Sequence, residues 1–259
     1  MTSQDGYLVR LAESEADHAA ALRLRYRVFV EELGANGPLV DHQAKMERDE
    51  FDPHFDHLVL IDQRRNARDL DHVVGVYRLL PCDRRAAAGR FYSETEFDLS
   101  VLKSSGRRLL ELGRSCVDPQ HRGGTGMFLM WNALAGYVLE REIDILFGAA
   151  SLRGTDVEAL NLPLSYLYHN HLAPEPLRVR AIGPQAAAMD RIPKGQIDRR
   201  EASATIPALI KAYLRLGGFV GDGAFVDHEF NTTDVCLVMD TERMSAKHRD
   251  FYTKRRAEA

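Results

Sequence analysis

Two charged residues three positions apart, Glu111 and Arg114, interrupt the apolar segment from Leu109 to Val117. A carboxylate in such surroundings can act as a general base, taking a proton from an attacking amine directly or through one water. Charges on an apolar strand are costly to bury unpaired, so each should have a specific partner. A structural ion pair is the alternative interpretation of these two residues.

A glycine-rich turn over residues 117–126 follows at once and leads into the apolar stretch 127–139. A strand, a tight turn and a helix start aim several backbone N–H groups at one point, which suits phosphate or pyrophosphate. Arg122 lies beside the glycines, and a guanidinium can pair with phosphate. The turn matches neither a P-loop nor a dinucleotide fingerprint, so an ordinary strand-to-helix turn is the alternative.

The spacing of Glu111 and Arg114 makes a further prediction about the backbone. In a flat strand, residues three apart point to opposite faces. Gly113 lies between them, and an isolated glycine in a strand often marks a bulge. We therefore predict a bulge that brings both charges to one side.

A second group of charges lies in the first third of the chain. Residues 47–52 carry four acids, a composition typical of a solvated loop. Arg78 lies within the apolar segment 73–80, where it needs an acid, and Asp49 or Asp52 would serve. Such a network is either structural or binds an amino-acid substrate. The nearby histidines, His54 and His57, match no standard metal-site spacing, so we expect no metal.

Hydrophobic patterns and turn signals set the elements that must position these residues. We expect helices over 19–32 and from 127, a helical region opened by a capping box at 155–158 and reaching 171, and a short helix after Pro207. We expect strands over 7–12, 57–62, 73–80, 109–117, 143–150 and 235–239, with 57–62 and 73–80 forming a hairpin. The simplest account is one α/β domain over residues 1–259 with a mixed sheet, in which 173–259 is a C-terminal elaboration.

Composition excludes several classes of protein. The formal net charge of -4 over 259 residues argues against a protein that coats nucleic acid. The three isolated cysteines fit a reducing cytosol, and the N-terminus lacks the features of a signal peptide. The apolar run 127–139 is too short to span a bilayer. We therefore expect a cytoplasmic protein whose membrane contact, at the inner face, is at most peripheral.

The strand–turn–helix unit resembles the acyl-donor motif of the GNAT acyltransferase superfamily. That resemblance implies a GNAT-like mixed central sheet flanked by helices, whose loop and helix N-terminus hold the pyrophosphate or phosphopantetheine of a thioester donor. The usual motif has glycines at positions corresponding to 125 and 127, whereas here they stand at 124 and 126. The shift favours the phosphopantetheine arm of a carrier protein over ordinary acetyl-CoA.

A narrower pattern in the first half resembles the acyl-homoserine-lactone synthases, which take acyl chains from acyl carrier protein. It comprises Arg25-x-x-Val28-Phe29, Glu47-x-Asp49-x-x-Asp52, His57-Leu58, Gly75-x-x-Arg78-Leu79-Leu80-Pro81 and Glu111-x-x-Arg114. The tryptophan that those synthases usually have after the first helix is absent, since Leu33-Gly34-Ala35 stands there.

Across nearly its full length the chain resembles the bacterial L-ornithine N-alpha-acyltransferases of ornithine-lipid synthesis. The segments that carry this resemblance are 110–117, 147–156, 164–169, 173–174 and 230–235. The resemblance implies that a 3-hydroxyacyl chain passes from acyl carrier protein to the alpha-amine of L-ornithine, giving lyso-ornithine lipid. The alternatives are a lactone synthase, an N-acyltransferase for another amino acid, a conventional acetyl-CoA N-acetyltransferase, and a non-enzymatic lipid- or carrier-binding module.

Roles for individual residues follow from this resemblance and from charge type. The catalytic candidates are Glu111 and Arg114. The candidates for the donor site are Cys116, Val117, Arg122, Gly123, Gly124, Thr125 and Gly126, and those for the amino-acid site are Arg25, Asp49, Asp52 and Arg78. No permanently bound cofactor is expected, since the donor is the acyl-phosphopantetheine of acyl carrier protein. That carrier is acidic, so a basic docking patch is expected, with candidates Arg84, Arg85, Arg90, Lys103, Arg107 and Arg108, for which a solvated surface is the alternative.

Overall fold

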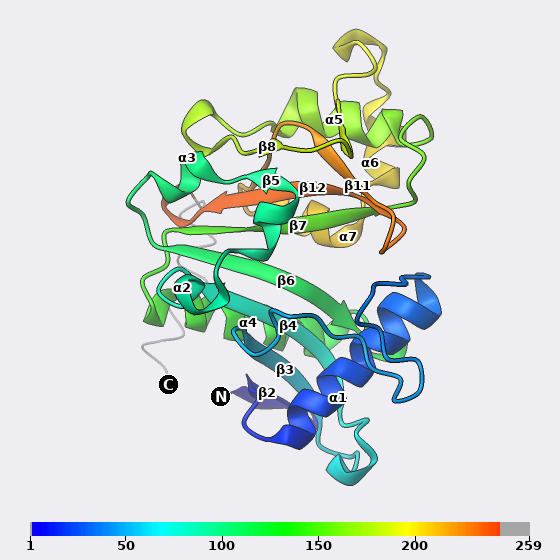
Figure 1. The fold of residues 1–259 in the computed structure, drawn as a ribbon, viewed down its shortest axis with the longest axis vertical. Helices are drawn as coiled ribbons and strands as arrows, with labels where there is room; N and C mark the ends of the chain where they lie inside the picture. Colours follow the sequence, from blue (N-terminus) through cyan, green and yellow to red (C-terminus); the bar gives the residue numbers. More distant parts are fainter. Residues whose placement is uncertain (1, 244–259) are drawn as a thin grey trace. The chain divides into compact units, whose positions relative to one another are not determined.

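The computed structural model describes residues 2–243 (Figure 1). Within this range the backbone forms two compact units: unit 1 comprises residues 2–89 and 112–142, and unit 2 comprises residues 90–111 and 143–243. Strand β6 (Leu109–Val117) begins in unit 2 and ends in unit 1. One domain over residues 1–259 stays a prediction, and its last sixteen residues, 244–259, lie outside the described range.

Unit 1 contains a sheet in which each strand neighbours the next in the order β1-β2-β3-β4-β6. Its strands are β1 (Thr2–Gln4), β2 (Tyr7–Leu11), β3 (Asp56–Asp62), β4 (Val73–Pro81) and the second part of β6. Strands β3 and β4 pair antiparallel, which confirms the predicted hairpin. Every residue of β4 is buried, so this strand is covered on both faces.

Helices α1 (Glu15–Arg25) and α4 (Gly124–Glu140) cover the two faces of this sheet (Figure 1). Alternate residues of β3 face them: Val59 packs in the core cluster that includes α1, whereas Leu60 lies against α4. A capping box of Ser14 and Asp17 starts α1. The chain then continues as a π-helix (Tyr26–Glu32), so the helix predicted over 19–32 begins earlier and changes pitch. The short helix α2 (Arg85–Ala88) follows β4.

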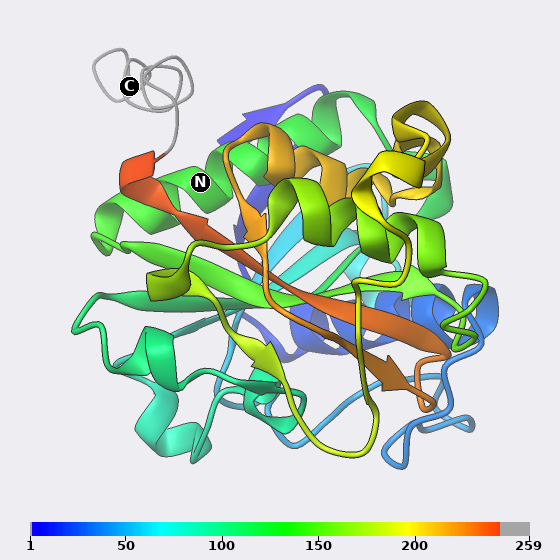
Figure 2. The same cartoon turned by 90° about the horizontal axis from the view of Figure 1, so that it is seen from above.

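The main sheet of unit 2 has the strand order β6-β7-β12-β11-β9, and β10 also pairs with β12. Strands β5 and β8 form a separate two-stranded sheet. Strand β7 runs parallel to the start of β6 and antiparallel to β12 along nine residue pairs, and Figure 2 shows β7 (green) beside β12 (orange-red). The elements of unit 2 are β5 (Phe97–Asp98), α3 (Ser100–Lys103), β7 (Ile145–Arg153), α5 (Asn161–His171), β8 (Arg180–Ala181), β9 (Ala186–Ala187), α6 (Arg199–Thr205), α7 (Ala208–Arg215), β10 (Phe219–Val220), β11 (Ala224–Asp227) and β12 (Thr232–Asp240).

One predicted helix start is wrong. Helix α5 begins at Asn161, and the acid at position 156 instead accepts hydrogen bonds from the N–H groups of Glu158 and Ala159 in a preceding turn. The sequence also suggests an interruption of this helix near Pro163. The helix continues through it, because Pro163 lies in the first turn, where a missing N–H breaks no intrahelical bond.

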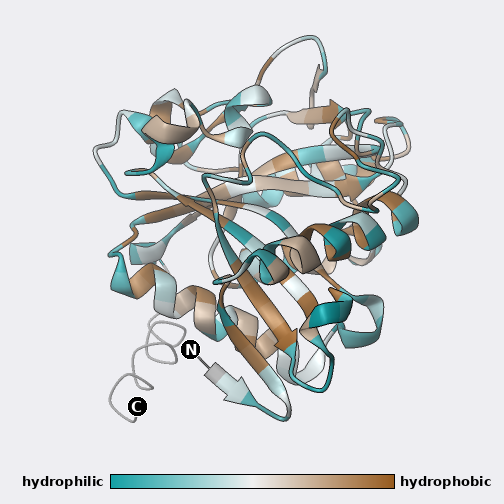
Figure 3. Cartoon of the chain, turned by 60° about the horizontal axis from the view of Figure 1, so that its bottom comes forward, coloured by the Kyte–Doolittle hydropathy of each residue, from teal (hydrophilic) through white to brown (hydrophobic). Residues whose placement is uncertain are grey.

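Hydropathy along the ribbon follows this arrangement, with hydrophobic segments on the strands and hydrophilic colouring on many connecting loops (Figure 3). The acidic residues 47–52 lie in the connection between the π-helix and β3, which has no helix or strand over residues 40–55 apart from a bridge between Asp41 and Met46. Among the described residues no helix is both long enough and apolar enough to cross a membrane.

Candidate active site

Three arginines and three acids form an ion-pair network within unit 1: Arg25, Glu47, Asp49, Asp52, Arg78 and Arg114. The Nε group of Arg25 donates to Glu47 Oε2 at 2.5 Å, and its Nη1 group donates to Asp52. The two loop acids at 49 and 52 thus lie beside arginines from helix and strand elements. Three of the four acids of segment 47–52 therefore enter a largely buried network, whereas Glu50 is exposed.

Arg78 is held by both of the acids predicted as its alternatives. Its Nη1 group donates to Asp49 Oδ1 at 2.6 Å and to Asp52 Oδ1 at 2.7 Å. Arg114 completes the network, with Nε 3.4 Å from Glu47 Oε1 and Nη2 3.1 Å from Asp49 Oδ2. The prediction that an acid neutralises Arg78 is confirmed.

Burial divides the network into an inner and an outer part. The side chains of Arg25 and Arg78 have no exposed surface, whereas those of Arg114 and Asp49 are 10% and 15% exposed. Burial by itself raises the pKa of Asp52, but the charges of Arg25 and Arg78 outweigh it and hold that pKa well below its usual range. The inner arginines therefore keep the acids ionised and in place, while the outer residues are the ones that a ligand can reach.

His57 lies against the same network. Its Nε2 atom is 3.2 Å from the carbonyl oxygen of Asp52 and 3.7 Å from Asp52 Oδ1. Burial lowers the pKa of His57 from 6.5 to about 4, despite the neighbouring Asp52 carboxylate. The folded protein therefore holds this imidazole neutral at neutral pH.

The pKa of His57 predicts how stability depends on pH. The histidine takes up a proton near pH 6.5 in the unfolded chain but only near pH 4 in the folded protein. Stability is therefore complete above pH 6.5 and falls by about 3 kcal/mol as pH drops to 4. Urea unfolding at pH 7.5 and pH 4.5 measures this difference. His57→Gln should remove most of it, and His54→Gln, at a nearby and only partly buried histidine, should not; the same pH slope in wild type and His57→Gln would contradict the assignment.

Glu111 lies in unit 2 and has backbone groups as its partners. Its Oε2 atom accepts a hydrogen bond from the N–H of Tyr92 at 2.8 Å, and its Oε1 atom accepts one from the N–H of Ser93 at 2.6 Å. The residue is 1% exposed. The carboxylate therefore holds the start of the 3₁₀ turn at 92–95, a charge-assisted contact that the sequence did not indicate.

Strand β6 has one residue in the left-handed region close to the predicted bulge. Arg114 has a φ of 48°, in the left-handed region, while Gly113 does not. A Cβ at Gly113 would meet Arg78 only at ordinary contact distance, 3.9 Å, so close packing does not require this glycine. A common face for Glu111 and Arg114 stays a prediction.

The turn after β6 uses its glycines for two different reasons. Gly123 and Gly124 have φ of 81° and 63°, which a side chain would oppose. A Cβ at Gly126 would come 2.9 Å from Leu60 Cδ2, so this glycine lets α4 approach the sheet. Helix α4 receives no side-chain cap at Gly123, and Thr125 Oγ1 donates to Asp5 at 3.2 Å. No side chain of the turn caps the start of α4, and backbone N–H groups at such a helix start have the arrangement expected of an anion site.

Arg122 already has a carboxylate partner. Its Nη1 and Nη2 groups donate to the two carboxylate oxygens of Glu32 at 2.8 and 2.5 Å, and its Nε group donates to the carbonyl of Val117 at 3.1 Å. Glu32 ends the π-helix, 90 residues away along the chain, and nothing in the sequence pointed to it. A phosphate bound by Arg122 must compete with this acid.

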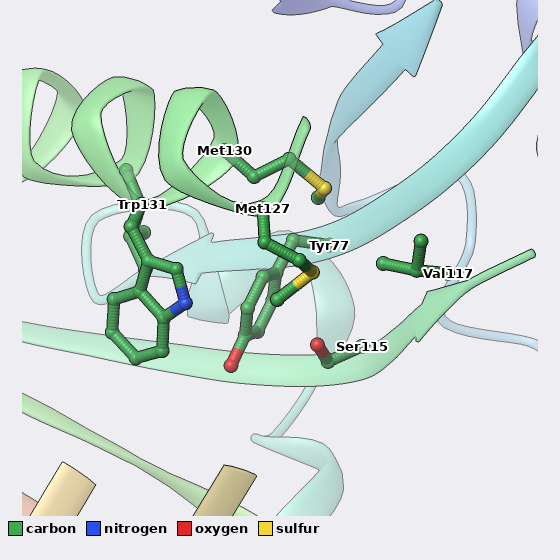
Figure 4. Close-up of a pocket in the computed structure, with 7 residues that line it drawn as sticks. Tyr77, Ser115, Val117, Met127, Met130 and Trp131 are labelled. Atoms are coloured by element: carbon green, nitrogen blue, oxygen red, sulfur yellow. The ribbon is translucent and has the colours of Figure 1, made fainter. Parts of the chain in front are cut away.

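An apolar pocket lies between β4, β6 and α4 in unit 1 (Figure 4). It is small, is partly open to solvent, and is lined by Tyr77, Ser115, Val117, Met127, Met130, Trp131 and Leu134. Of these residues the sequence indicated only Val117. The signal that was available is the spacing of 127, 130, 131 and 134, which places four large side chains on one face of a helix.

Cys116 lies between the pocket residues Ser115 and Val117 on β6. Burial raises the pKa of its thiol to about 12, which favours the protonated thiol at neutral pH. Since the thiolate is the reactive form, this burial disfavours a covalent intermediate on Cys116.

A family model described as an acetyltransferase (GNAT) domain matches residues 24–132. The L-ornithine N(alpha)-acyltransferase of Rhodobacter capsulatus is 62% identical over 249 residues, covering 96% of this chain and 95% of the relative. The chain belongs to the L-ornithine N(alpha)-acyltransferase family. The acyltransferase of the same name from Brucella abortus is 41% identical over 246 residues, 94% of this chain and 88% of the relative.

The fold of this acyltransferase is also found among solved structures. A CoA-dependent acyl-homoserine lactone synthase, BjaI, superposes with a TM-score of 0.52 at 16% identity, covering 96% of this chain and 89% of the synthase. Together with the family model, this similarity confirms the predicted GNAT-like fold with a large mixed sheet flanked by helices.

The predicted docking residues of the acyltransferase are partly engaged in ion pairs. Arg84 donates to Asp56 at 2.5 Å, Lys103 pairs with Glu94, and Arg107 forms two bonds to Asp240 at 2.8 and 2.7 Å. Exposed ion pairs are weak, so an acidic partner can compete for Arg84 and Lys103. Docking of a carrier protein on these residues stays a prediction.

Proposed function

We propose that this acyltransferase transfers a 3-hydroxyacyl chain from acyl carrier protein to the alpha-amine of L-ornithine, giving lyso-ornithine lipid. The observation that carries the proposal is the 62% identity to a named L-ornithine N(alpha)-acyltransferase along 96% of the chain. The aligned region covers 96% of the chain, so the similarity extends over the C-terminal half as well as the donor motif.

The donor site proposed for the thioester is the turn and pocket of unit 1. Arg122 and the amides of residues 123–126 would hold the phosphopantetheine phosphate, since both offer donors to an anion. The apolar pocket beside Val117 would take the part of the acyl chain next to the thioester. Backbone N–H groups near Cys116 and Val117 would polarise the thioester carbonyl.

The reaction requires a neutral amine. In the proposed mechanism the Glu111 carboxylate takes a proton from the alpha-ammonium, directly or through one water, and the free amine attacks the thioester carbon. The C–N bond forms and the C–S bond breaks. The nitrogen then loses a second proton, which passes to the departing sulfur, so that the carrier leaves as the free thiol and the product is a neutral amide. The first proton stays on Glu111 and is released to solvent before the next turnover. The protonated Cys116 thiol supports direct transfer between donor and amine.

The amino-acid site proposed on unit 1 uses the outer part of the ion-pair network. Arg114 would meet the substrate carboxylate, and Asp49 or Asp52 a substrate ammonium. Their side chains retain some exposure, whereas Arg25 and Arg78 are wholly buried. We predicted from their charge that Arg25 and Arg78 bind the substrate carboxylate. Because both are wholly buried, they would instead position the acids.

Arg122→Ala tests the donor site. Loss of a charged contact to phosphate should raise the donor KM about 10- to 100-fold and leave the ornithine KM within about twofold. Steady-state kinetics with each substrate varied in turn measures the two constants. Glu32→Gln weakens the two hydrogen bonds between Arg122 and the Glu32 carboxylate, so it should lower the donor KM. As a control, Arg48→Ala, at an exposed arginine paired with Asp41, should change neither the donor KM nor the ornithine KM. An equal rise in both KM values for Arg122→Ala would refute the assignment.

The overall proposal is tested by expressing the gene in a bacterial host without ornithine lipids and analysing the extracted lipids by mass spectrometry. The expected product is N-(3-hydroxyacyl)ornithine. Acylation of a different amino acid, formation of homoserine lactone from S-adenosylmethionine, or a preference for acetyl-CoA in a donor competition would overturn it.

A further inference from the structure

Three buried carboxylates of unit 2 converge at one place. They belong to Glu96, which follows the 3₁₀ turn 92–95, to Asp227 at the end of β11, and to Asp234 within β12. One oxygen from each lies within 4.8 Å of the others, and among the described residues no other such group of metal-ligand side chains occurs. The residues are 2%, 9% and 5% exposed. Three acceptors are thus held together below the surface by three separate segments.

A buried hydroxyl faces the same place. Thr232 pairs directly with Asp227 across β11 and β12 and lies two residues before Asp234, so the three side chains share one face of the sheet. Thr232 is 7% exposed, and its Oγ1 atom has no hydrogen-bond partner among the described residues. By contrast, Thr233 on the other face donates to the carbonyl of Gly154 at 2.8 Å. Buried hydroxyls are normally bonded, so Thr232 marks a position for a ligand.

We propose that the side-chain ammonium of a diamino-acid substrate binds to Glu96, Asp227, Asp234 and Thr232. The substrate ammonium assigned above to Asp49 or Asp52 is then the alpha-ammonium. An ammonium carries three N–H donors and one positive charge, which matches three converging carboxylate oxygens with a hydroxyl beside them. A divalent metal would use the same carboxylate oxygens together with water, so the experiment below includes metal removal. The inference rests on the proposed function, because ornithine brings a second ammonium that remains charged when its alpha-amine is acylated.

Cys236 lies two residues after Asp234 on β12, so its side chain is on the face of the strand that carries Thr232 and Asp234. Burial raises the pKa of the Cys236 thiol in β12, and the carboxylates of Glu111 and Glu96 raise it further. Both carboxylates therefore act on the same thiol from within unit 2.

Asp234→Asn and Thr232→Val test the assignment by comparing ornithine with norvaline, which has the same carbon chain without the terminal amine. Wild type should favour ornithine in kcat/KM. Asp234→Asn should raise the ornithine KM about 10- to 100-fold, the loss of one hydrogen bond to a charged group, and leave norvaline unchanged. Thr232→Val removes a hydroxyl that has no internal partner, so it should keep the melting temperature while raising the ornithine KM several-fold.

The matched control is Asp240→Asn, a buried aspartate on the same strand that pairs with Arg107. It should affect both amino acids equally. If ornithine is acylated but both site variants impair ornithine and norvaline to the same extent, the ammonium assignment is wrong while the proposed function stands. Activity that is lost with EDTA and restored by Mg²⁺ would assign the carboxylates to a metal. Failure of wild type to acylate ornithine at all would refute the proposed function itself.

Discussion

Replacing Arg78 with methionine should destabilise the protein by about 3–5 kcal/mol at pH 7. The guanidinium has no exposed surface and donates to both Asp49 and Asp52. It also lies over the Phe55 ring, with Cζ 4.5 Å from the ring centroid. Methionine fills much of the space but leaves two adjacent, largely buried carboxylates without their shared cation. Urea denaturation at pH 7 measures the loss.

The control for this variant is Arg48→Met. Arg48 also pairs with an aspartate, at 3.0 Å, but its side chain is 53% exposed, so its loss should cost less than about 1 kcal/mol. The Arg78 effect should shrink below about pH 4. The arginine holds the pKa of Asp49 and Asp52 low in the folded protein, so the stability they contribute is present above their unfolded pKa and is lost as pH falls. A loss below 1 kcal/mol for Arg78→Met, or one independent of pH, would contradict this account of the network.

Glu111→Gln should lower kcat by about 10²- to 10⁴-fold at neutral pH, the usual contribution of a general base. The amide cannot take the proton from the attacking amine, so the acidic limb of the pH–rate profile should disappear as well. The variant also turns one acceptor into a donor opposite the backbone N–H groups of Tyr92 and Ser93, which should lower the melting temperature. Turnover and thermal unfolding are therefore measured together.

Glu94→Gln separates the two roles of Glu111. Glu94 lies in the same turn and likewise accepts a backbone N–H bond, from Phe91 at 2.9 Å. It should lower the melting temperature without removing the acidic limb of the pH–rate profile. Near-normal turnover of Glu111→Gln would show that Glu111 is not the base. A loss matched by Glu94→Gln with the same pH profile would make Glu111 a residue that only positions the turn.

The secondary elements near the site were largely predictable from the sequence. The hairpin of β3 and β4, the strand β6, the glycine turn and helix α4 all have local signals, namely apolar runs bounded by turn residues. The capping box predicted at 155–158 does not start a helix, because Asp156 accepts hydrogen bonds from two N–H groups of a preceding turn. The bulge predicted around Gly113 stays a prediction, and the left-handed backbone in β6 is at Arg114, since neighbouring pairings and contacts decide which residue takes the strained conformation.

By itself the sequence determined the fold class, the acid demanded by Arg78, the positions of the loop glycines and the family. These follow from local periodicity, from the cost of burying a lone charge and from long identical strings. Only the tertiary structure decided which partners the charges take. Glu32 on Arg122, backbone N–H groups on Glu111, and the meeting of Glu96, Asp227, Thr232 and Asp234 join residues far apart in the chain. Such pairings depend on how packed strands and loops align in space, and no spacing along the chain encodes that alignment.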